Sequence, residues 1–202
     1  MTFSDGTLRM LALGDSYTIG ESVEAEHRWP VQLSRRLRER GVMIGDVAII
    51  ARTGWTTGEL HAAIDAQKPA GPFDYVTLLI GVNDQYRGGT AEAFRAAFAS
   101  VLERAVALAG GDSGRVIVVS IPDWGVMPFA EGRDREIIAQ QIDAFNEVCR
   151  STAVTRLVTF VDLTAISRRA ATQPALVAED GLHPSAAQYA LWARAIDEVM
   201  AR

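Results

Sequence analysis

A regular alternation of short apolar runs and helical patterns constrains the fold of this chain more than any other feature of its sequence. The apolar runs cover residues 8–13, 47–51, 75–80, 116–121 and 158–163. Most of these runs are nearly continuous in apolar residues, which is typical of strands that a parallel sheet buries on both faces. Strands that alternate with helices predict an α/β fold with a mainly parallel sheet.

Helical patterns occupy the intervals between the apolar runs. They cover residues 30–41, 57–67, 90–111 and 134–152, and a last one begins at residue 185. Ser185 and Gln188 have the form of a capping box, a serine followed three residues later by a glutamine. Right-handed crossovers place such helices on both faces of the sheet. We therefore expect one three-layer α/β/α domain over residues 1–202, with five strands in the flavodoxin-like order 2-1-3-4-5.

Charge and composition argue against several classes of protein. The chain has 202 residues and a net charge of −5, whereas a nucleic-acid-binding protein usually carries a basic face. No stretch approaches the roughly 20 apolar residues of a membrane span, and residues 1–6 lack the pattern of a signal peptide. The single Cys149 excludes an internal disulfide, and its helical spacing predicts a core thiol. We expect a cytoplasmic protein that binds neither nucleic acid nor membrane.

Short segments rich in glycine and polar residues follow the predicted strands. They are residues 14–16, 52–55, 81–84 and 122–125, together with residues 180–184 just before the last helix. In open α/β sheets the functional groups lie beyond the carboxyl ends of the strands. We therefore expect all of these segments to meet at one edge of the sheet.

Three residues in these segments have complementary chemistry. The hydroxyl of Ser16 is a poor nucleophile until a base removes its proton, and His183 is the natural base near neutral pH. A carboxylate must orient the imidazole, and Asp180 lies three residues before His183 in the same predicted loop. Asp123 and Asp162 also follow strands, but neither is linked to a histidine by its spacing. We predict Ser16, His183 and Asp180 as a catalytic triad; the alternative for Ser16 is a helix cap.

The negative oxygen of a tetrahedral intermediate needs hydrogen-bond donors. The candidates are the backbone N–H groups of Ser16 and Gly54 and the side-chain amide of Asn83. Gly54 suits a close approach of the backbone because it has no Cβ. Asn83 could instead be a turn residue in a left-handed conformation, and Asp84 is expected to brace its loop rather than to react.

Aromatic side chains flank the candidate catalytic loops. Trp55, Tyr86 and Trp124 either line a substrate pocket or pack the loops, and the segment 124–133 is a candidate for a loop that covers the substrate. No G-x-G-x-x-G follows the first strand and no G-K-S/T loop occurs, which argues against a nucleotide-binding domain. The chain also lacks the G-x-S-x-G of nucleophile-elbow hydrolases and the H-x-x-x-H pair of many metal hydrolases.

In this order and at these strand ends, the residues resemble the SGNH hydrolases, also called GDSL esterases and lipases. Residues 14–16 match the first block of that family and Gly54 matches the glycine of its second block. Residues 81–84 match its G-x-N-D block, and residues 180–183 match its D-x-x-H block. Tyr17 stands where the family name has a leucine, at a position that varies among members.

The resemblance implies that the protein hydrolyses a small-molecule ester or thioester through an acyl-enzyme, without a metal or another cofactor. It also implies a shallow and rather mobile active site. Removal of acetyl groups from a carbohydrate, or transfer of the acyl group to another alcohol, would use the same residues and is the alternative.

Overall fold

The computed structural model describes residues 6–201, in which parallel strands form one five-stranded sheet in the order β2-β1-β3-β4-β5. The strands are β1 (Met10–Gly14), β2 (Ala48–Ala51), β3 (Tyr75–Leu79), β4 (Val116–Val119) and β5 (Thr159–Val161). The predicted strand order is therefore confirmed. The first apolar run begins before β1 does, because Leu8 forms only an isolated bridge to Ile44.

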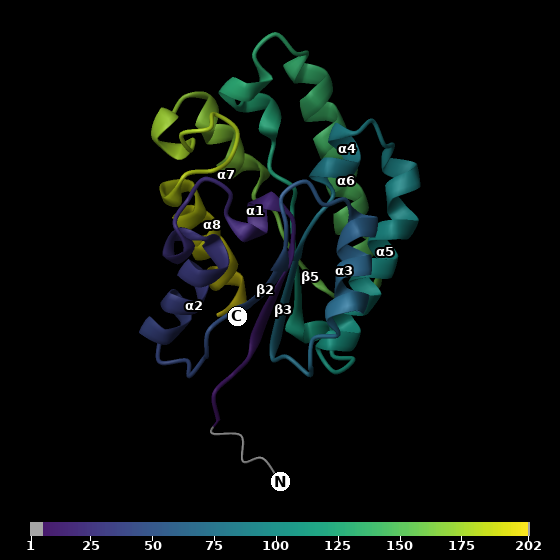
Figure 1. Ribbon diagram of the computed structural model, residues 1–202, viewed down its shortest axis with the longest axis vertical. Helices are drawn as coiled ribbons and strands as arrows, with labels where there is room; N and C mark the ends of the chain where they lie inside the picture. The colour runs from purple at the N-terminus through teal and green to yellow at the C-terminus, as the bar shows by residue number, and fades with distance from the viewer. Residues whose placement is uncertain (1–5, 202) are drawn as a thin grey trace.

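Helices cover both faces of the sheet, which confirms the three layers predicted from the sequence (Figure 1). One face carries α2 (Trp29–Glu39) and α8 (Ala186–Met200), and the other carries α3 (Thr57–Gln67), α5 (Ala91–Leu108) and α6 (Arg135–Thr155). The short helices are α1 (Ser16–Ile19), α4 (Val82–Tyr86) and α7 (Thr164–Arg168). Single 3₁₀ turns lie at Ala25–His27, Ser113–Arg115, Trp124–Val126, Pro128–Ala130, Arg169–Ala171 and Pro174–Leu176.

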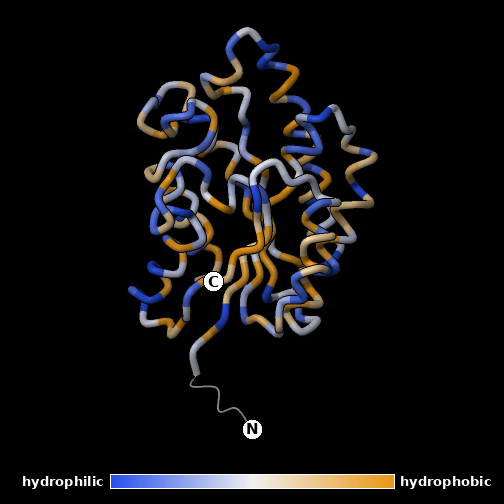
Figure 2. Tube along the Cα trace, viewed as in Figure 1, coloured by the Kyte–Doolittle hydropathy of each residue, from blue (hydrophilic) through white to orange (hydrophobic). Residues whose placement is uncertain are grey.

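The sheet and the inward faces of the helices form the hydrophobic core. Both β1 and β4 are buried along their whole length, and Figure 2 shows apolar strands between helices that carry many polar residues. Trp29 on α2 and Trp192 on α8 are fully buried on the face where these two helices pack together. Cys149 is buried in α6, as predicted. Within residues 6–201, no helix is both long enough and apolar enough to cross a membrane.

Two helix starts show how local sequence sets the element boundaries. Thr56 and Glu59 form a complete capping box at the start of α3. At the start of α8, Ser185 accepts the N–H of Gln188, but the Gln188 side chain donates to the carbonyl of Leu176 at 3.0 Å. The N–H of Ser185 already donates to that carbonyl at 2.9 Å, so it does not need the glutamine. The predicted capping box at Ser185 is therefore wrong in its second half.

Candidate active site

Ser16 lies where β1 ends and α1 begins. It is the first residue of α1, and Asp15 caps this helix by accepting the N–H of Tyr17 at 3.0 Å. A Cβ atom at Gly14 would overlap the side chain of Thr18 and a carbonyl oxygen of β3, so glycine allows α1 to start close against the sheet. The N–H of Ser16 belongs to the first turn of the helix, whose donors have no partner within the helix.

His183 and Asp180 meet in the loop that precedes α8. The Nδ1 atom of His183 lies 2.6 Å from Oδ2 of Asp180, while Oδ1 of Asp180 accepts the N–H groups of Leu182 and His183, each at 2.9 Å. A carboxylate only accepts hydrogen bonds, so the proton of the neutral imidazole lies on Nδ1. The Nε2 atom then carries the lone pair that can accept a proton.

Hydrogen bonds keep Asp180 ionised. Partial burial of this carboxyl group acts to raise its pKa, but the N–H and the ring of His183, the N–H of Leu182 and the hydroxyl of Ser22 all donate to it. Their combined effect holds the pKa of Asp180 well below its usual range. Asp180 is therefore a carboxylate at any pH at which a neutral histidine can act as a base.

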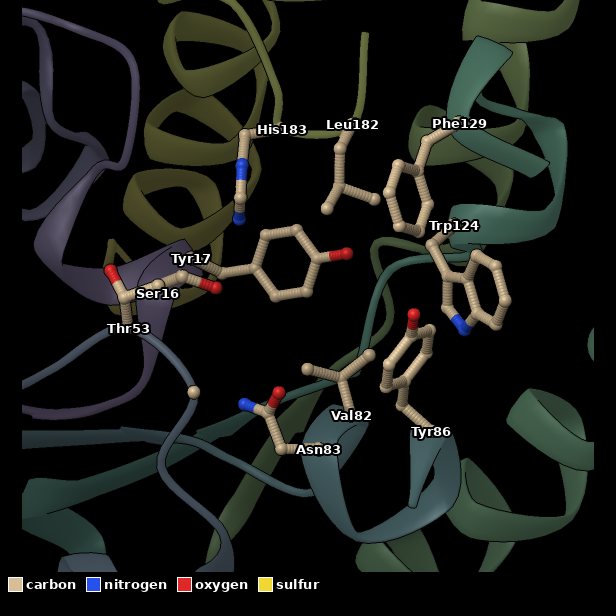
Figure 3. A pocket seen from close by; sticks show the side chains of 11 residues that line it. Ser16, Tyr17, Thr53, Val82, Asn83, Tyr86, Trp124, Phe129, Leu182 and His183 are labelled. Atoms are coloured by element: carbon tan, nitrogen blue, oxygen red, sulfur yellow. The ribbon is translucent and has the colours of Figure 1, made fainter. Parts of the chain in front are cut away.

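Ser16 and His183 line one pocket, which has a volume of about 170 Å³. Its lining residues are Ser16, Tyr17, Thr53, Gly54, Val82, Asn83, Tyr86, Trp124, Phe129, Leu182 and His183. Figure 3 shows Ser16 and Asn83 toward one end of this pocket and a group of aromatic rings at the other. In the described part of the chain no hydrogen bond joins the Ser16 hydroxyl to the His183 ring, so the two groups share the pocket without being locked together.

Gly54 and Asn83, the other predicted oxyanion donors, line the same pocket as Ser16. The Asn83 side chain donates one amide N–H to the carbonyl of Trp55 at 2.9 Å, which holds the amide in place and leaves a second N–H. Gly54 has a φ of +83°, and its carbonyl accepts the Arg87 guanidinium at 2.7 Å. A Cβ atom at Gly54 would meet only the Arg87 guanidinium, at 3.9 Å, so within the protein it is the left-handed backbone that favours glycine here.

The remaining acids at the strand ends have structural partners. Asp84 accepts the N–H and the hydroxyl of Thr57, at 2.9 and 3.0 Å, and so braces the start of α3 as predicted. Asp123 pairs with Arg168 at 2.9 Å, and Asp162 accepts the N–H of the first residue of α7 at 2.8 Å. Within residues 6–201, none of these three acids is bonded to a histidine.

Asp15, next to Ser16 in the chain, is a buried acid. Its side chain is fully buried, and its Oδ2 atom has no hydrogen-bond partner among the described residues. Burial raises the pKa of Asp15 to about 8; the N–H of Tyr17 opposes this change and the charge of Asp84 adds to it. Asp15 is therefore mainly protonated at neutral pH.

The end of the pocket far from Ser16 is formed by Tyr86, Trp124 and Phe129, which we call the aromatic wall (Figure 3). Their ring centroids lie 5.4, 6.2 and 6.3 Å apart. Arg133 covers all three rings, at 5.3 Å from two of them and 5.4 Å from the third. The indole N–H of Trp124 donates to Gln85 at 2.8 Å, which fixes the orientation of this ring.

The structure places Tyr86 and Trp124 in the pocket lining but leaves Trp55 outside it. The Trp55 side chain is partly buried and packs against the core. Of the two alternatives predicted for it, it therefore has the packing role and does not line the pocket. Leu182 and Phe129 line the pocket without having been predicted individually. Leu182 lies beside His183 and Phe129 lies inside the segment 124–133, and this adjacency was the only signal in the sequence that could have identified them.

The pocket offers a serine hydroxyl, a histidine ring and several N–H donors, and the Asp180 carboxylate contacts that ring from outside the pocket lining; this set of groups can carry out acyl transfer to a serine. Among residues 6–201, no group of three or more histidine, cysteine, aspartate and glutamate side chains is placed to hold a metal ion. His61 pairs with Asp65 at 3.5 Å on α3, and neither residue lines the pocket.

One family model matches most of the chain. The model of the GDSL-like lipase/acylhydrolase family matches residues 12–191. No curated protein matches the sequence.

Several solved structures have a similar fold. A member of the lipolytic protein G-D-S-L family from Veillonella parvula gives a TM-score of 0.74 at 18% identity, over 97% of this chain and 100% of that one. The acetylxylan esterase Axe2 from Geobacillus stearothermophilus gives 0.71 at 24% identity, over 95% and 93% of the two chains. A protein named TesA gives 0.73 at 20% identity, over 95% and 97%. At these identities the similarity supports the fold.

Proposed function

The chain belongs to the GDSL-like lipase/acylhydrolase family, a family of carboxylic ester hydrolases, and from that premise we propose that it cleaves small-molecule esters by a serine mechanism. Ser16 is the nucleophile, His183 is the general base, and Asp180 orients the imidazole. The observation that carries the proposal is the 2.6 Å contact between Asp180 and Nδ1 of His183, a histidine that lines the same pocket as Ser16. That contact leaves Nε2 as the ring atom that can take a proton.

In the first half of the reaction, Nε2 of His183 takes the hydroxyl proton of Ser16 while Oγ attacks the carbonyl carbon of the ester. The carbonyl oxygen becomes an oxyanion, which accepts hydrogen bonds from the N–H groups of Ser16 and Gly54 and from the second amide N–H of Asn83. The imidazolium then donates its proton to the alcohol oxygen as the C–O bond breaks. The alcohol leaves and the acyl group stays on Ser16.

In the second half, a water molecule takes the place of the alcohol. Nε2 of His183 accepts a proton from this water, whose oxygen attacks the acyl carbon, and the imidazolium returns the proton to Oγ of Ser16 as the carboxylic acid departs. Asp180 remains a carboxylate throughout and stabilises the imidazolium. Its lowered pKa supports this role.

The size and polarity of the pocket favour a short acyl group. The pocket measures about 170 Å³ and ends at the aromatic wall, and an apolar cavity of about 150 Å³ holds a molecule the size of benzene. We therefore propose esters with acyl chains of up to about six carbons as substrates. The same steps release an alcohol from an ester or a thiol from a thioester, because the imidazolium can protonate either leaving group.

Hydrolysis of p-nitrophenyl esters from acetate to decanoate, by the wild type and by Ser16→Ala, tests this proposal. We expect wild-type activity to be highest at or below about six carbons, and Ser16→Ala to lose turnover by a factor on the order of 10⁴–10⁶. Ser100→Ala, on the exposed face of α5, is the matched control and should keep wild-type activity.

Equal hydrolysis by the wild type and Ser16→Ala would contradict the role of Ser16. A rate that rises steadily with chain length would contradict the short acyl pocket and leave the serine mechanism standing.

A second candidate is the removal of acetyl groups from a carbohydrate. The observation that favours it is the partial exposure of Tyr86, at 46%, and of Phe129, at 41%, which leaves aromatic surface at the pocket for contact with a sugar even though Arg133 covers part of it. Release of acetate from an acetylated xylo-oligosaccharide, compared with release from p-nitrophenyl acetate, tests it. A rate on the oligosaccharide no higher than the uncatalysed rate would argue against this substrate.

A further inference from the structure

We propose that Ser22 is a positioning residue of the active site, which holds the Asp180 carboxylate in line with His183. The inference rests on the proposed function, in which Asp180 orients the base. Its central observation is that the Ser22 hydroxyl donates to Oδ2 of Asp180 at 2.7 Å, the same oxygen that lies 2.6 Å from Nδ1 of His183. Ser22 lies outside the lining of the pocket that contains Ser16, so it acts through Asp180 and not on the substrate.

Ser22 completes the hydrogen bonding of the Asp180 carboxylate. Oδ1 already accepts two backbone N–H groups of its own loop, those of Leu182 and His183. Without Ser22, Oδ2 would be held only by the imidazole that it is meant to orient. With Ser22, each oxygen has two donors, and the plane of the carboxylate is set by groups outside the histidine ring.

The backbone at Ser22 adopts a conformation that a serine rarely takes. Its φ is +63°, in the left-handed region where a Cβ atom is unfavourable and glycine is the usual residue. The shape of the loop alone would be met more easily by glycine. What the serine adds at this position is its hydroxyl, and this conformation directs the hydroxyl to Asp180.

The loop that carries Ser22 is also bonded to the nucleophile. The N–H groups of Gly20 and Glu21 both donate to the carbonyl of Ser16, each at 3.0 Å. One end of this short loop is therefore tied to the residue that attacks the ester, and the other end to the acid that orients the base. Asp180 comes from a distant part of the chain, so Ser22 sets the position of the acid relative to the nucleophile.

Loss of the Ser22 hydroxyl should lower turnover without weakening substrate binding. The contact is exposed to solvent, so a water molecule can replace the hydroxyl as a donor but cannot hold the same geometry. We expect kcat to fall about 3- to 10-fold, which is the range for one charge-assisted hydrogen bond that water partly replaces. KM should change less than twofold, because the substrate pocket is intact.

Ser22→Gly is the informative variant, because it removes the hydroxyl and relieves the backbone at the same time. Leu157→Gly is the matched control: Leu157 also has a left-handed φ, of +56°, and is 85% exposed on the loop before β5. Both variants should keep or raise the melting temperature. On a p-nitrophenyl ester, kcat should fall in Ser22→Gly and stay at the wild-type value in Leu157→Gly. Ser22→Ala should show a fall in kcat similar to that of Ser22→Gly, together with a lower melting temperature.

The outcomes separate this inference from the proposed function. Wild-type kcat in Ser22→Gly, measured beside an inactive Ser16→Ala, would overturn the role of Ser22 alone. A fall in activity that only follows a fall in the folded fraction would overturn it as well. An active Ser16→Ala would instead overturn the proposed function, and this inference with it.

Discussion

The loops that hold Asp15 and Asp180 are two parts of the same site with opposite electrostatics. Asp15 is fully buried, and one of its carboxyl oxygens has no partner in the described chain. Asp180 is only partly buried and receives four hydrogen bonds from Ser22, Leu182 and His183. The pKa of Asp15 is therefore raised to about 8, and that of Asp180 lies well below its usual range.

The difference shows that burial and hydrogen-bond donors, and not position next to Ser16 in the sequence, decide which of the two carboxyl groups is ionised at neutral pH. Asp15 is next to Ser16 in the sequence, yet at neutral pH it is mainly protonated and has little charge to offer an imidazolium. Its function is to cap α1 and so to hold Ser16. Two acids in different surroundings thus take different roles.

The largest expected effect comes from Asp180→Asn. The amide can no longer hold the proton on Nδ1 of His183 or balance the charge of the imidazolium, so kcat should fall by a factor of about 10³–10⁴. Asp15→Asn is the matched control and should keep kcat within about tenfold, because asparagine also caps helices. Initial rates on a p-nitrophenyl ester measure both variants. A greater loss in Asp15→Asn than in Asp180→Asn would reverse the assignment.

The second prediction concerns the pH dependence of stability. Between about pH 4 and pH 8 the folded protein keeps the proton of Asp15 while the unfolded chain releases it, so the free energy of unfolding falls as pH rises. The slope from this one group is at most about 1.4 kcal/mol per pH unit. Asp180 acts in the opposite sense, because its stabilising contribution is lost only as pH falls below its unfolded pKa.

Asp15→Asn isolates the contribution of Asp15 to that decline. Urea unfolding of the wild type and the variant at several pH values from 4 to 9 should give curves that separate as pH rises, with the variant more stable on the alkaline side. Parallel curves would mean that Asp15 is not protonated in the folded protein.

The smallest expected effect comes from Asp84→Asn. The charge of Asp84 contributes to the raised pKa of Asp15. Removing that charge should therefore lower the pH above which the free energy of unfolding stops falling. Between pH 4 and pH 8 the variant should lose roughly 0.5 kcal/mol less of its free energy of unfolding than the wild type, the scale of a weak charge interaction; comparing the two pH values cancels the constant cost of the changed contact with Thr57. The exposed Asp46, paired with Arg38, supplies the control variant Asp46→Asn, which should leave the decline where it is.

Most of the fold could be predicted because its signals are local. Apolar runs buried on both faces identify the strands, and the order of strands and helices along the chain is readable directly. The capping box at Thr56 and Glu59 was also readable, since both residue types stand at the right spacing. The capping box predicted for Ser185 and Gln188 is incomplete because the carbonyl of Leu176, which lies outside the helix, accepts the Gln188 side chain instead.

The site could be predicted only where its groups are neighbours in the sequence or follow a strand. Asp180 and His183 lie three residues apart and bond each other, so their spacing is informative. The protonation of Asp15 depends on burial by segments far away in the sequence. The same is true of Trp55 and Phe129: packing with distant elements turns one toward the core and the other toward the pocket.

The packing of α8 against α2 has a consequence for the synthesis of the protein. Ser16 emerges from the ribosome with the first strand, whereas His183 emerges just before α8. A nascent chain that ends before residue 180 therefore carries Ser16 without the aspartate and the histidine of the proposed triad. In the proposed mechanism, hydrolysis therefore has to wait until residues 180–183 have been synthesised and α8 has packed against α2.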